Sequence, residues 1–198
     1  MMTEARIIAI LRGITPAECV EQVACLRDHG ISTVEITTNS PEWVTSLQRL
    51  DEAFGDEVTV GAGTVLTPEQ VNTCAAAGAK FILTPNLDLR VIGAAKRQGL
   101  AVCAGVMTPS EIFTACEAGA DVLKIFPASA VPENYPQMIK GPLSLPVRFS
   151  AVGGVDMDNA AAYLRYYDSV GLGSALYRPG QPVTTTAARC ARWLESRP

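Results

Sequence analysis

Histidine and paired cysteines are scarce in this chain of 198 residues. His29 is the only histidine, and the six cysteines are spread along the chain without a CxxC pair. Zinc sites cluster such ligands, and secreted disulfide scaffolds are short and dense in cysteine. A dinucleotide fingerprint is also missing, because GAGT at 61–64 lacks the third glycine and an acidic partner. We therefore expect no metal ion, no cofactor and reduced thiols.

The chain also lacks an excess of positive charge and a long apolar run. Sixteen lysines and arginines stand against 20 acidic residues, which gives a formal net charge of −4. This balance provides no basic surface for nucleic acid or for an acidic membrane. The early apolar run Ile7–Leu11 is too short for a signal-peptide core or a membrane span. We expect a cytoplasmic protein that binds neither nucleic acid nor membranes.

Short aliphatic runs recur along the chain and predict strands. Most are apolar on both faces, as buried parallel strands are. The predicted strands are Ile7–Leu11, Thr33–Thr37, Val58–Ala62, Phe81–Thr84, Ala101–Ala104, Val122–Ile125, Arg148–Val152 and Ser169–Leu172. Eight strands that alternate with helices, without a linker, predict an α/β protein with a single (β/α)8 TIM barrel over residues 1–198. The structural alternative is a doubly wound open sheet.

Helix boundaries are indicated by capping residues and glycines. A hydroxyl side chain precedes a proline at Thr15-Pro16, Ser40-Pro41, Thr67-Pro68 and Thr108-Pro109, which predicts four helix starts. Glycines that suit a left-handed position after a helix stand at Gly30, Gly78, Gly99 and Gly119. His29 lies at one of these helix ends, where we expect it to serve the helix terminus rather than chemistry.

Lys124 is the residue that most strongly indicates chemistry. It interrupts the apolar strand VLKIF, whereas the other three lysines lie in or beside polar helical segments. A buried ammonium needs a partner or loses its proton, and an amine without its proton is a nucleophile. Glu35 interrupts the apolar strand TVEIT in the same way and could act as a general acid and base. The structural alternative is a salt bridge between the two inside the barrel.

Other polar and glycine residues follow the predicted strands, at the end where barrel enzymes bind substrate. Backbone N–H groups after the last two strands often hold a phosphate. The residues at these positions are Arg12, Thr64, Pro85, Gly153, Gly154, Gly173 and Ser174. The alternative for the glycine pairs is that they form tight turns and nothing more.

Several motifs in order along nearly the whole chain carry a family resemblance. They are LKIFPAS around Lys124, VEITTNSP around Glu35, VGAGTVL at 60–66, TPN at 84–86 and AVGGV at 151–155. With them the chain resembles the 2-dehydro-3-deoxy-6-phosphogluconate and -galactonate aldolases. The resemblance implies a homotrimer of barrels that splits a 2-keto-3-deoxy sugar-acid phosphate into pyruvate and glyceraldehyde 3-phosphate. It implies a metal-independent class I aldolase that works through a Schiff base.

The resemblance also implies roles for single residues. Lys124 would form the Schiff base and Glu35 would move protons through water. Thr64 and Pro85 would line the pyruvate pocket, with Phe126 close to the lysine. The glycine turns, Gly153, Gly154 and Gly173 with Ser174, would hold the phosphate.

Within the family the sequence is closer to the galactonate branch, and galactonate catabolism is the role this implies. ILRGITP at 10–16 and GLGSALYRPG at 171–180 resemble that branch. The gluconate enzymes usually carry an arginine where Asn39 stands, so Arg12 is expected to bind the carboxylate instead. They also tend to have threonine where Val152 stands, and valine cannot bond a substrate hydroxyl, which bears on the configuration at C4.

Three other functions stay open at this point. A gluconate-type or 4-hydroxy-2-oxoglutarate aldolase of the same family would use the same imine. A phosphate-binding isomerase or epimerase would need Glu35 but no imine. A sugar-phosphate-binding protein without activity would bind its ligand and release no pyruvate.

Overall fold

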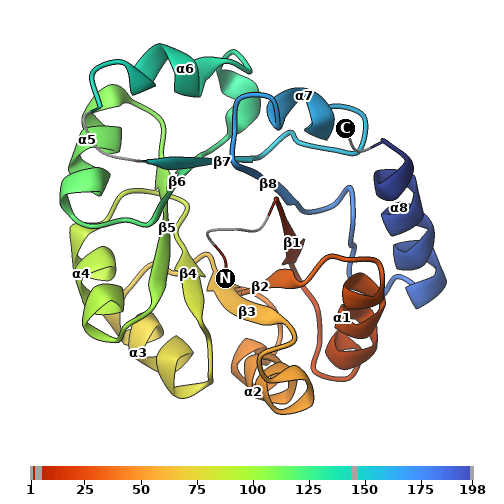
Figure 1. Cartoon of the computed structure of the whole chain (residues 1–198). Coiled ribbons are helices and arrows are strands. Elements are labelled where there is room, and N and C mark those ends of the chain that lie inside the picture. The colour runs from red at the N-terminus through yellow and green to blue at the C-terminus, as the bar shows by residue number, and fades with distance from the viewer. Residues whose placement is uncertain (1, 3–5, 144–146, 197–198) are drawn as a thin grey trace.

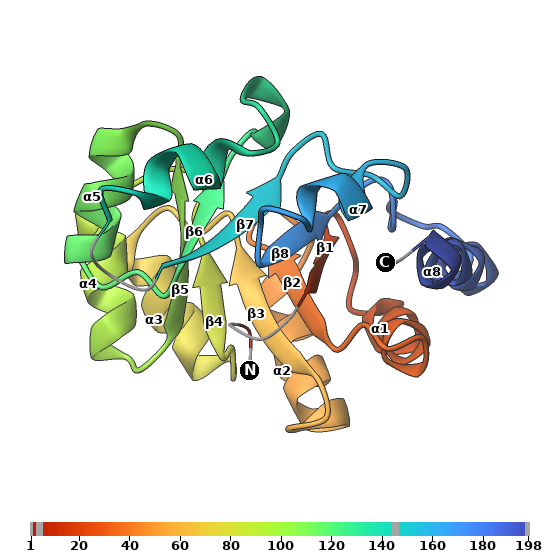
Figure 2. The ribbon, with the colours of Figure 1, turned by 45° about the horizontal axis from the view of Figure 1, so that its top comes forward.

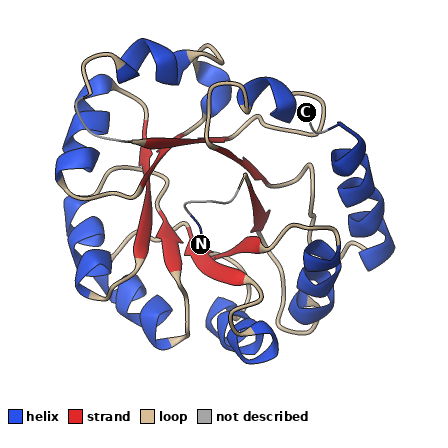
Figure 3. Ribbon diagram, in the orientation of Figure 1, coloured by secondary structure: helices blue, strands red, loops and turns tan. Residues whose placement is uncertain are grey.

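The fold is a closed ring of eight parallel strands surrounded by helices (Figures 1 and 3). The computed structural model describes residues 2, 6–143 and 147–196. The strands pair in chain order, and β8 (Ser169–Leu172) returns to pair with β1 (Ile7–Leu11). Closure confirms the predicted (β/α)8 barrel and makes the open sheet wrong. The predicted single domain over 1–198 includes residues 1, 3–5, 144–146 and 197–198, which lie outside the described residues, and it stays a prediction.

The strands lie where their apolar runs predicted, with small differences in three of the strands. Between β1 and β8 they are β2 (Thr33–Thr37), β3 (Thr59–Gly63), β4 (Phe81–Leu83), β5 (Ala101–Val106), β6 (Val122–Ile125) and β7 (Arg148–Val152). β4 ends before Thr84 because the Thr84 side chain, rather than its backbone, accepts the bond from Gly105 N, at 3.0 Å. β3 is shifted by one residue and β5 is longer by two.

Helices follow the strands around the outside of the ring (Figure 2). They are α1 (Cys19–Asp28), α2 (Trp43–Phe54), α3 (Pro68–Ala76), α4 (Leu89–Arg97), α5 (Pro109–Glu117), α6 (Tyr135–Lys140), α7 (Ala160–Tyr163) and α8 (Val183–Ser196), with the 3-10 helix η2 (Ala128–Ala130). The glycines predicted to follow helices, Gly30, Gly78, Gly99 and Gly119, have φ between +71° and +88°, which confirms that prediction.

Two of the four predicted helix starts are confirmed and two are wrong. Thr67 and Thr108 cap α3 and α5, and Thr108 forms a full capping box with Glu111. Thr15 instead binds Glu18 through its N–H and hydroxyl, both at 3.1 Å, in a turn before α1. Ser40 accepts a bond from Gly13 N at 2.8 Å. Both hydroxyls are used in loops, so α1 and α2 begin further along the chain.

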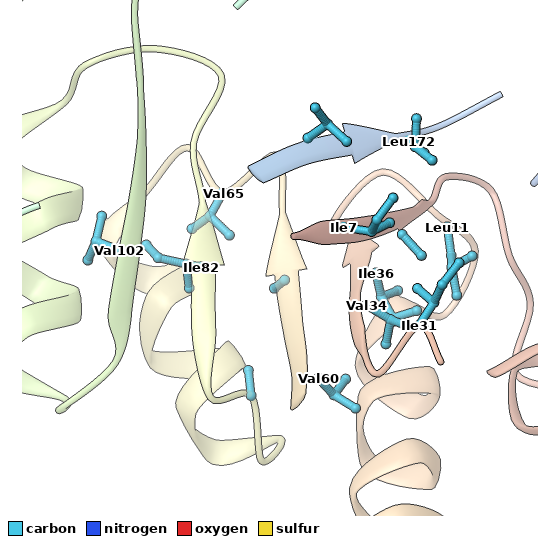
Figure 4. Close-up of a cluster of buried hydrophobic side chains, with 14 of the residues drawn as sticks. Ile7, Leu11, Ile31, Val34, Ile36, Val60, Val65, Ile82, Val102 and Leu172 are labelled. Atoms are coloured by element: carbon cyan, nitrogen blue, oxygen red, sulfur yellow. The ribbon is translucent and has the colours of Figure 1, made fainter. Parts of the chain in front are cut away.

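Two apolar layers stabilise the barrel. The outer layer lies between strands and helices, and Figure 4 shows part of it, with Leu11, Ile36 and Ile82 among its labelled side chains. The inner layer fills the barrel interior and consists of Met2, Ile8, Phe81, Leu83, Cys103 and Val122. Side chains alternate sides along a strand, so the next inward positions lie above this layer, toward the carboxyl ends. Glu35 and Lys124 stand there.

Candidate active site

Lys124 is buried inside the barrel on β6. Its backbone lies opposite Gly105 of β5 and Ser150 of β7. Only 6% of the residue is exposed, and its Nζ lies 4.9 Å from the centre of the Phe126 ring. Phe126 follows β6 and is 39% exposed, so its ring covers the amine from the open end of the barrel.

Glu35 on β2 is almost completely buried, at 2% exposure. Its Oε2 has no hydrogen-bond partner among the described residues. Burial raises the pKa of this carboxyl group, although the charges of Lys124 and then Arg12 oppose the shift. Burial wins because a carboxylate without hydrogen bonds loses its hydration and gains little in return. A carboxyl group whose pKa is raised holds a proton more readily, which suits a group that accepts a proton and later returns it.

Lys124 and Glu35 face the same interior but do not form an ion pair. No ion pair between them is found within the part of the chain that the structure describes, although Lys124 still acts on Glu35 through its charge. The structural alternative of a salt bridge across the barrel is therefore wrong. Both groups keep their reactive atoms available to a molecule placed between them.

Arg12 lies at the mouth of the barrel, just beyond β1. Its Nη1 donates to Asn39 Oδ1 at 2.9 Å and lies 3.5 Å from Thr64 Oγ1. Thr64 has φ of 59°, a left-handed conformation that is rare outside glycine, and its carbonyl accepts a bond from Thr38 Oγ1 at 2.6 Å. These contacts bring the ends of β1, β2 and β3 together around one guanidinium group.

The Gly153-Gly154 turn packs closely against the segment after β6. A Cβ on Gly153 would come 3.0 Å from Pro127 Cα, and one on Gly154 would come 2.5 Å from Ser129 Cβ. Ser129 N donates to Gly153 O at 3.1 Å. Both glycines have positive φ, so the turn requires glycine for conformation and for space. Ser129 is the last residue of the LKIFPAS motif, and nothing in the sequence pattern alone indicates this contact.

The Gly173-Ser174 turn lies beside the Gly153-Gly154 turn, because β7 pairs with β8. Gly173 O accepts bonds from the N–H groups of Leu176 and Tyr177, which makes a single helical turn. The N–H groups that begin such a turn point outward and are suited to an anion. Ser174 is exposed at its start.

Pro85 and Val152 occupy opposite sides of the mouth. A Cβ on Gly105 would come 2.4 Å from the carbonyl carbon of Pro85, so the turn after β4 lies directly on β5, next to Lys124. Val152 is buried at the end of β7, and its Cγ2 would lie 2.8 Å from a Cβ on Gly171. All the residues predicted for the site thus lie at one end of the barrel.

Two further features bear on the type of site. Among residues 2, 6–143 and 147–196, no three His, Cys, Asp or Glu side chains gather as metal ligands would. No helix in the same residues is long and apolar enough to cross a membrane.

Comparison with known proteins assigns the family. The family model described as KDPG and KHG aldolase matches residues 1–184. The chain belongs to the KDPG and KHG aldolase family. The 2-dehydro-3-deoxy-6-phosphogalactonate aldolase of Escherichia coli K12 is 45% identical over 195 residues, which are 98% of this chain and 95% of that one. These matches place the chain among aldolases, which are carbon–carbon lyases.

Several solved structures have the same fold as this chain. A native KDPGal structure has a TM-score of 0.93 and 44% identity, and covers 98% of this chain and 94% of its own. A KDPG aldolase from Legionella pneumophila, with pyruvate captured at low pH as a covalent carbinolamine intermediate, has a TM-score of 0.86 and 25% identity, at 99% and 96% coverage. A cube-shaped cage designed by fusing symmetric oligomeric domains has a TM-score of 0.93 and 44% identity over 98% of this chain and 72% of its own.

Proposed function

We propose that this aldolase cleaves 2-dehydro-3-deoxy-6-phosphogalactonate to pyruvate and glyceraldehyde 3-phosphate through a Schiff base on Lys124. The proposal depends mainly on one observation. Lys124 and Glu35 are both buried and face the same barrel interior, and they do not form an ion pair with each other. The substrate is supported by the Escherichia coli relative, and the covalent chemistry by the Legionella pneumophila structure with its carbinolamine.

The amine of Lys124 attacks the C2 ketone of the substrate and forms a carbinolamine. Loss of water leaves a protonated imine, which accepts the electron pair of the C3–C4 bond when that bond breaks. The C4 hydroxyl gives its proton to Glu35, directly or through water, and becomes the aldehyde of glyceraldehyde 3-phosphate. Glu35 then returns the proton to C3 of the enamine, and water hydrolyses the imine to free pyruvate and Lys124.

Two groups of residues hold the ends of the substrate in this proposal. Arg12, already placed by Asn39 and Thr64, binds the C1 carboxylate by a two-pronged contact. The N–H groups of the Gly153-Gly154 and Gly173-Ser174 turns bind the C6 phosphate. Thr64, Pro85 and Phe126 enclose the pyruvate half of the molecule.

Release of pyruvate in a coupled assay tests the proposal, with the two C4-epimeric substrates offered separately. We expect faster cleavage of the phosphogalactonate compound. Faster cleavage of the phosphogluconate epimer would keep the imine but reject the substrate assignment. A Lys124→Met variant should release no pyruvate from either epimer, and Lys80→Met, at the amino end of β4, is the matched control. Turnover that survives Lys124→Met would favour an isomerase or epimerase.

A homotrimer is part of the same proposal. Large apolar side chains are exposed on neighbouring elements, namely Leu66 before α3, Leu89 on α4, Phe113 on α5 and Met138 on α6. These helices follow one another around one side of the barrel (Figure 1), where a contact between copies would cover them. The cage structure adds support, because its fused domains are described as symmetric oligomers. Light scattering should give three times the mass of one chain.

Cytoplasmic location and a role in galactonate catabolism complete the proposal. All six cysteines are free, as is usual in a reducing compartment. Cell fractionation tests the location, and growth on galactonate after loss of the protein tests the role.

A further inference from the structure

We infer that Ile10 is a specificity-determining residue, which together with Val152 selects the configuration of the substrate at C4. This inference rests on the proposed function. It adds Ile10, which lies on the other side of Gly171 from Val152.

Gly171 lies between two side chains that meet above it. A Cβ on Gly171 would come 2.8 Å from Val152 Cγ2 and 3.0 Å from Ile10 Cδ1. Val152 comes from β7 and Ile10 from β1, the two strands that flank β8. The absence of a side chain at Gly171 therefore lets Val152 and Ile10 close over β8 as one apolar surface. Both residues are buried, at 4% and 7% exposure, and neither carries a polar atom on its side chain.

Ile10 also lies between two parts of the proposed site, namely Glu35 and the Gly173-Ser174 turn. Its backbone is opposite Glu35 of β2, so the two side chains lie on the inner face of neighbouring strands. Its Cβ lies 3.9 Å from the position of a Cβ on Gly173, at the start of the second phosphate turn. Ile10 thus occupies the space between the proposed proton carrier and the proposed phosphate site.

The position of this apolar surface determines which part of the substrate meets it. Lys124 on β6 fixes C2, and the turns after β7 and β8 fix the phosphate on C6. The intervening carbons must therefore pass the carboxyl ends of β7, β8 and β1. A C4 hydroxyl that points at Val152 and Ile10 loses its hydrogen bonds to water and finds no partner, which penalises that epimer. The other epimer points its hydroxyl away, toward Glu35.

The test compares Ile10→Thr with Ile10→Val. Both variants are shorter than isoleucine and have nearly the same shape, but threonine carries a hydroxyl group where valine has a methyl group. The measured quantity is the ratio of kcat/KM for the phosphogalactonate and phosphogluconate substrates in one preparation. This ratio is independent of the folded fraction, because both substrates meet the same active enzyme. We expect threonine to shift the ratio toward the phosphogluconate epimer by about 3- to 10-fold relative to valine, the effect of one hydrogen bond.

Equal ratios in the threonine and valine variants would overturn the inference. If threonine at this position does not give folded protein, Ile10→Ser and Ile10→Ala provide the same comparison with smaller side chains. Failure of the proposed function is a separate outcome that is seen in the unmodified protein, which would then cleave neither epimer or would cleave the phosphogluconate epimer faster. A protein that cleaves at least one epimer, with a ratio insensitive to the hydroxyl at position 10, rejects the role of Ile10 alone.

Discussion

Gly63 lies so close to Glu35 that a Cβ at this position would stand 2.0 Å from Glu35 Oε1. The two residues are on neighbouring strands, β3 and β2, and both face the barrel interior. Only a hydrogen atom at position 63 leaves room for the carboxyl group. The geometry of the proposed proton carrier therefore depends on a glycine that carries no reactive atom.

Gly63→Ala should lower kcat by about 100-fold, because a displaced acid–base group loses a contribution of roughly 10²- to 10⁴-fold. Trapping of the lysine imine should continue, since Lys124 is not moved directly. Gly93→Ala in α4 is the matched control, because its Cβ would be 3.5 Å from Arg97 Nη1, an ordinary contact. An alanine at position 63 that left kcat within a factor of two would contradict the role of Glu35.

Glu35→Gln should raise the melting temperature, and the gain should increase with pH. The pKa of Glu35 is raised in the folded protein, mainly by burial. The native chain therefore loses stability as pH rises from the unfolded value of about 4.3 through the folded pKa. Glutamine does not titrate, so its advantage should be small at pH 4 and level off above the folded pKa.

The measurement is thermal unfolding between pH 4 and pH 8 for both proteins. Glu52→Gln, an exposed side chain on α2, is the matched control. An advantage that decreased with rising pH would show that Glu35 is stabilised as a carboxylate in the fold.

Arg12→Gln should raise KM by about 10- to 100-fold, since a charge-assisted contact to a carboxylate contributes roughly 1.5 to 3 kcal/mol. Arg27→Gln removes an equally long cation that binds Asp28 and Glu57 on the outside of the barrel, and should leave KM unchanged. Steady-state kinetics of both variants, with the substrate epimer that the native enzyme cleaves faster, test this prediction. Equal KM values in the two variants would remove Arg12 from the carboxylate site.

Thr108→Ala should reduce stability without a change in catalysis. Thr108 caps α5 and exchanges bonds with Glu111, and loss of such a cap costs about 1 kcal/mol. In a protein of this size that corresponds to a fall of roughly 2 to 4 °C in Tm. The prediction is tested by measuring thermal unfolding and kcat on the same preparation of the variant. A change in kcat at unchanged Tm would mean that α5 acts on the site.

The barrel could be predicted because its strands are short, apolar and regularly spaced. The burial of Lys124 and Glu35 could be predicted from the same pattern, since each interrupts an apolar strand where a charge is costly. The helix starts were predicted less well. Thr15-Pro16 and Ser40-Pro41 have the same local sequence signal as Thr67-Pro68, and only the fold determines whether the hydroxyl binds a helix end or another loop.

The features of the candidate site that could not be predicted depend on contacts across strands. Ile10 resembles any other aliphatic residue of β1 until the register places it beside Glu35 and Gly171. Ser129 is a common residue until the Gly154 turn is seen to pack against it. The salt bridge between Lys124 and Glu35 was a reasonable hypothesis from composition, but the barrel keeps the two groups unpaired.

Reduction of the protein with borohydride in the presence of pyruvate tests the central claim most directly. The imine predicted here would be reduced to a stable secondary amine, and peptide mass mapping should find one reduced pyruvyl (1-carboxyethyl) group, on Lys124. Native protein without pyruvate and the Lys124→Met variant should both stay unmodified. No adduct in the native protein, or an adduct on Lys80, Lys96 or Lys140 instead, would contradict the account.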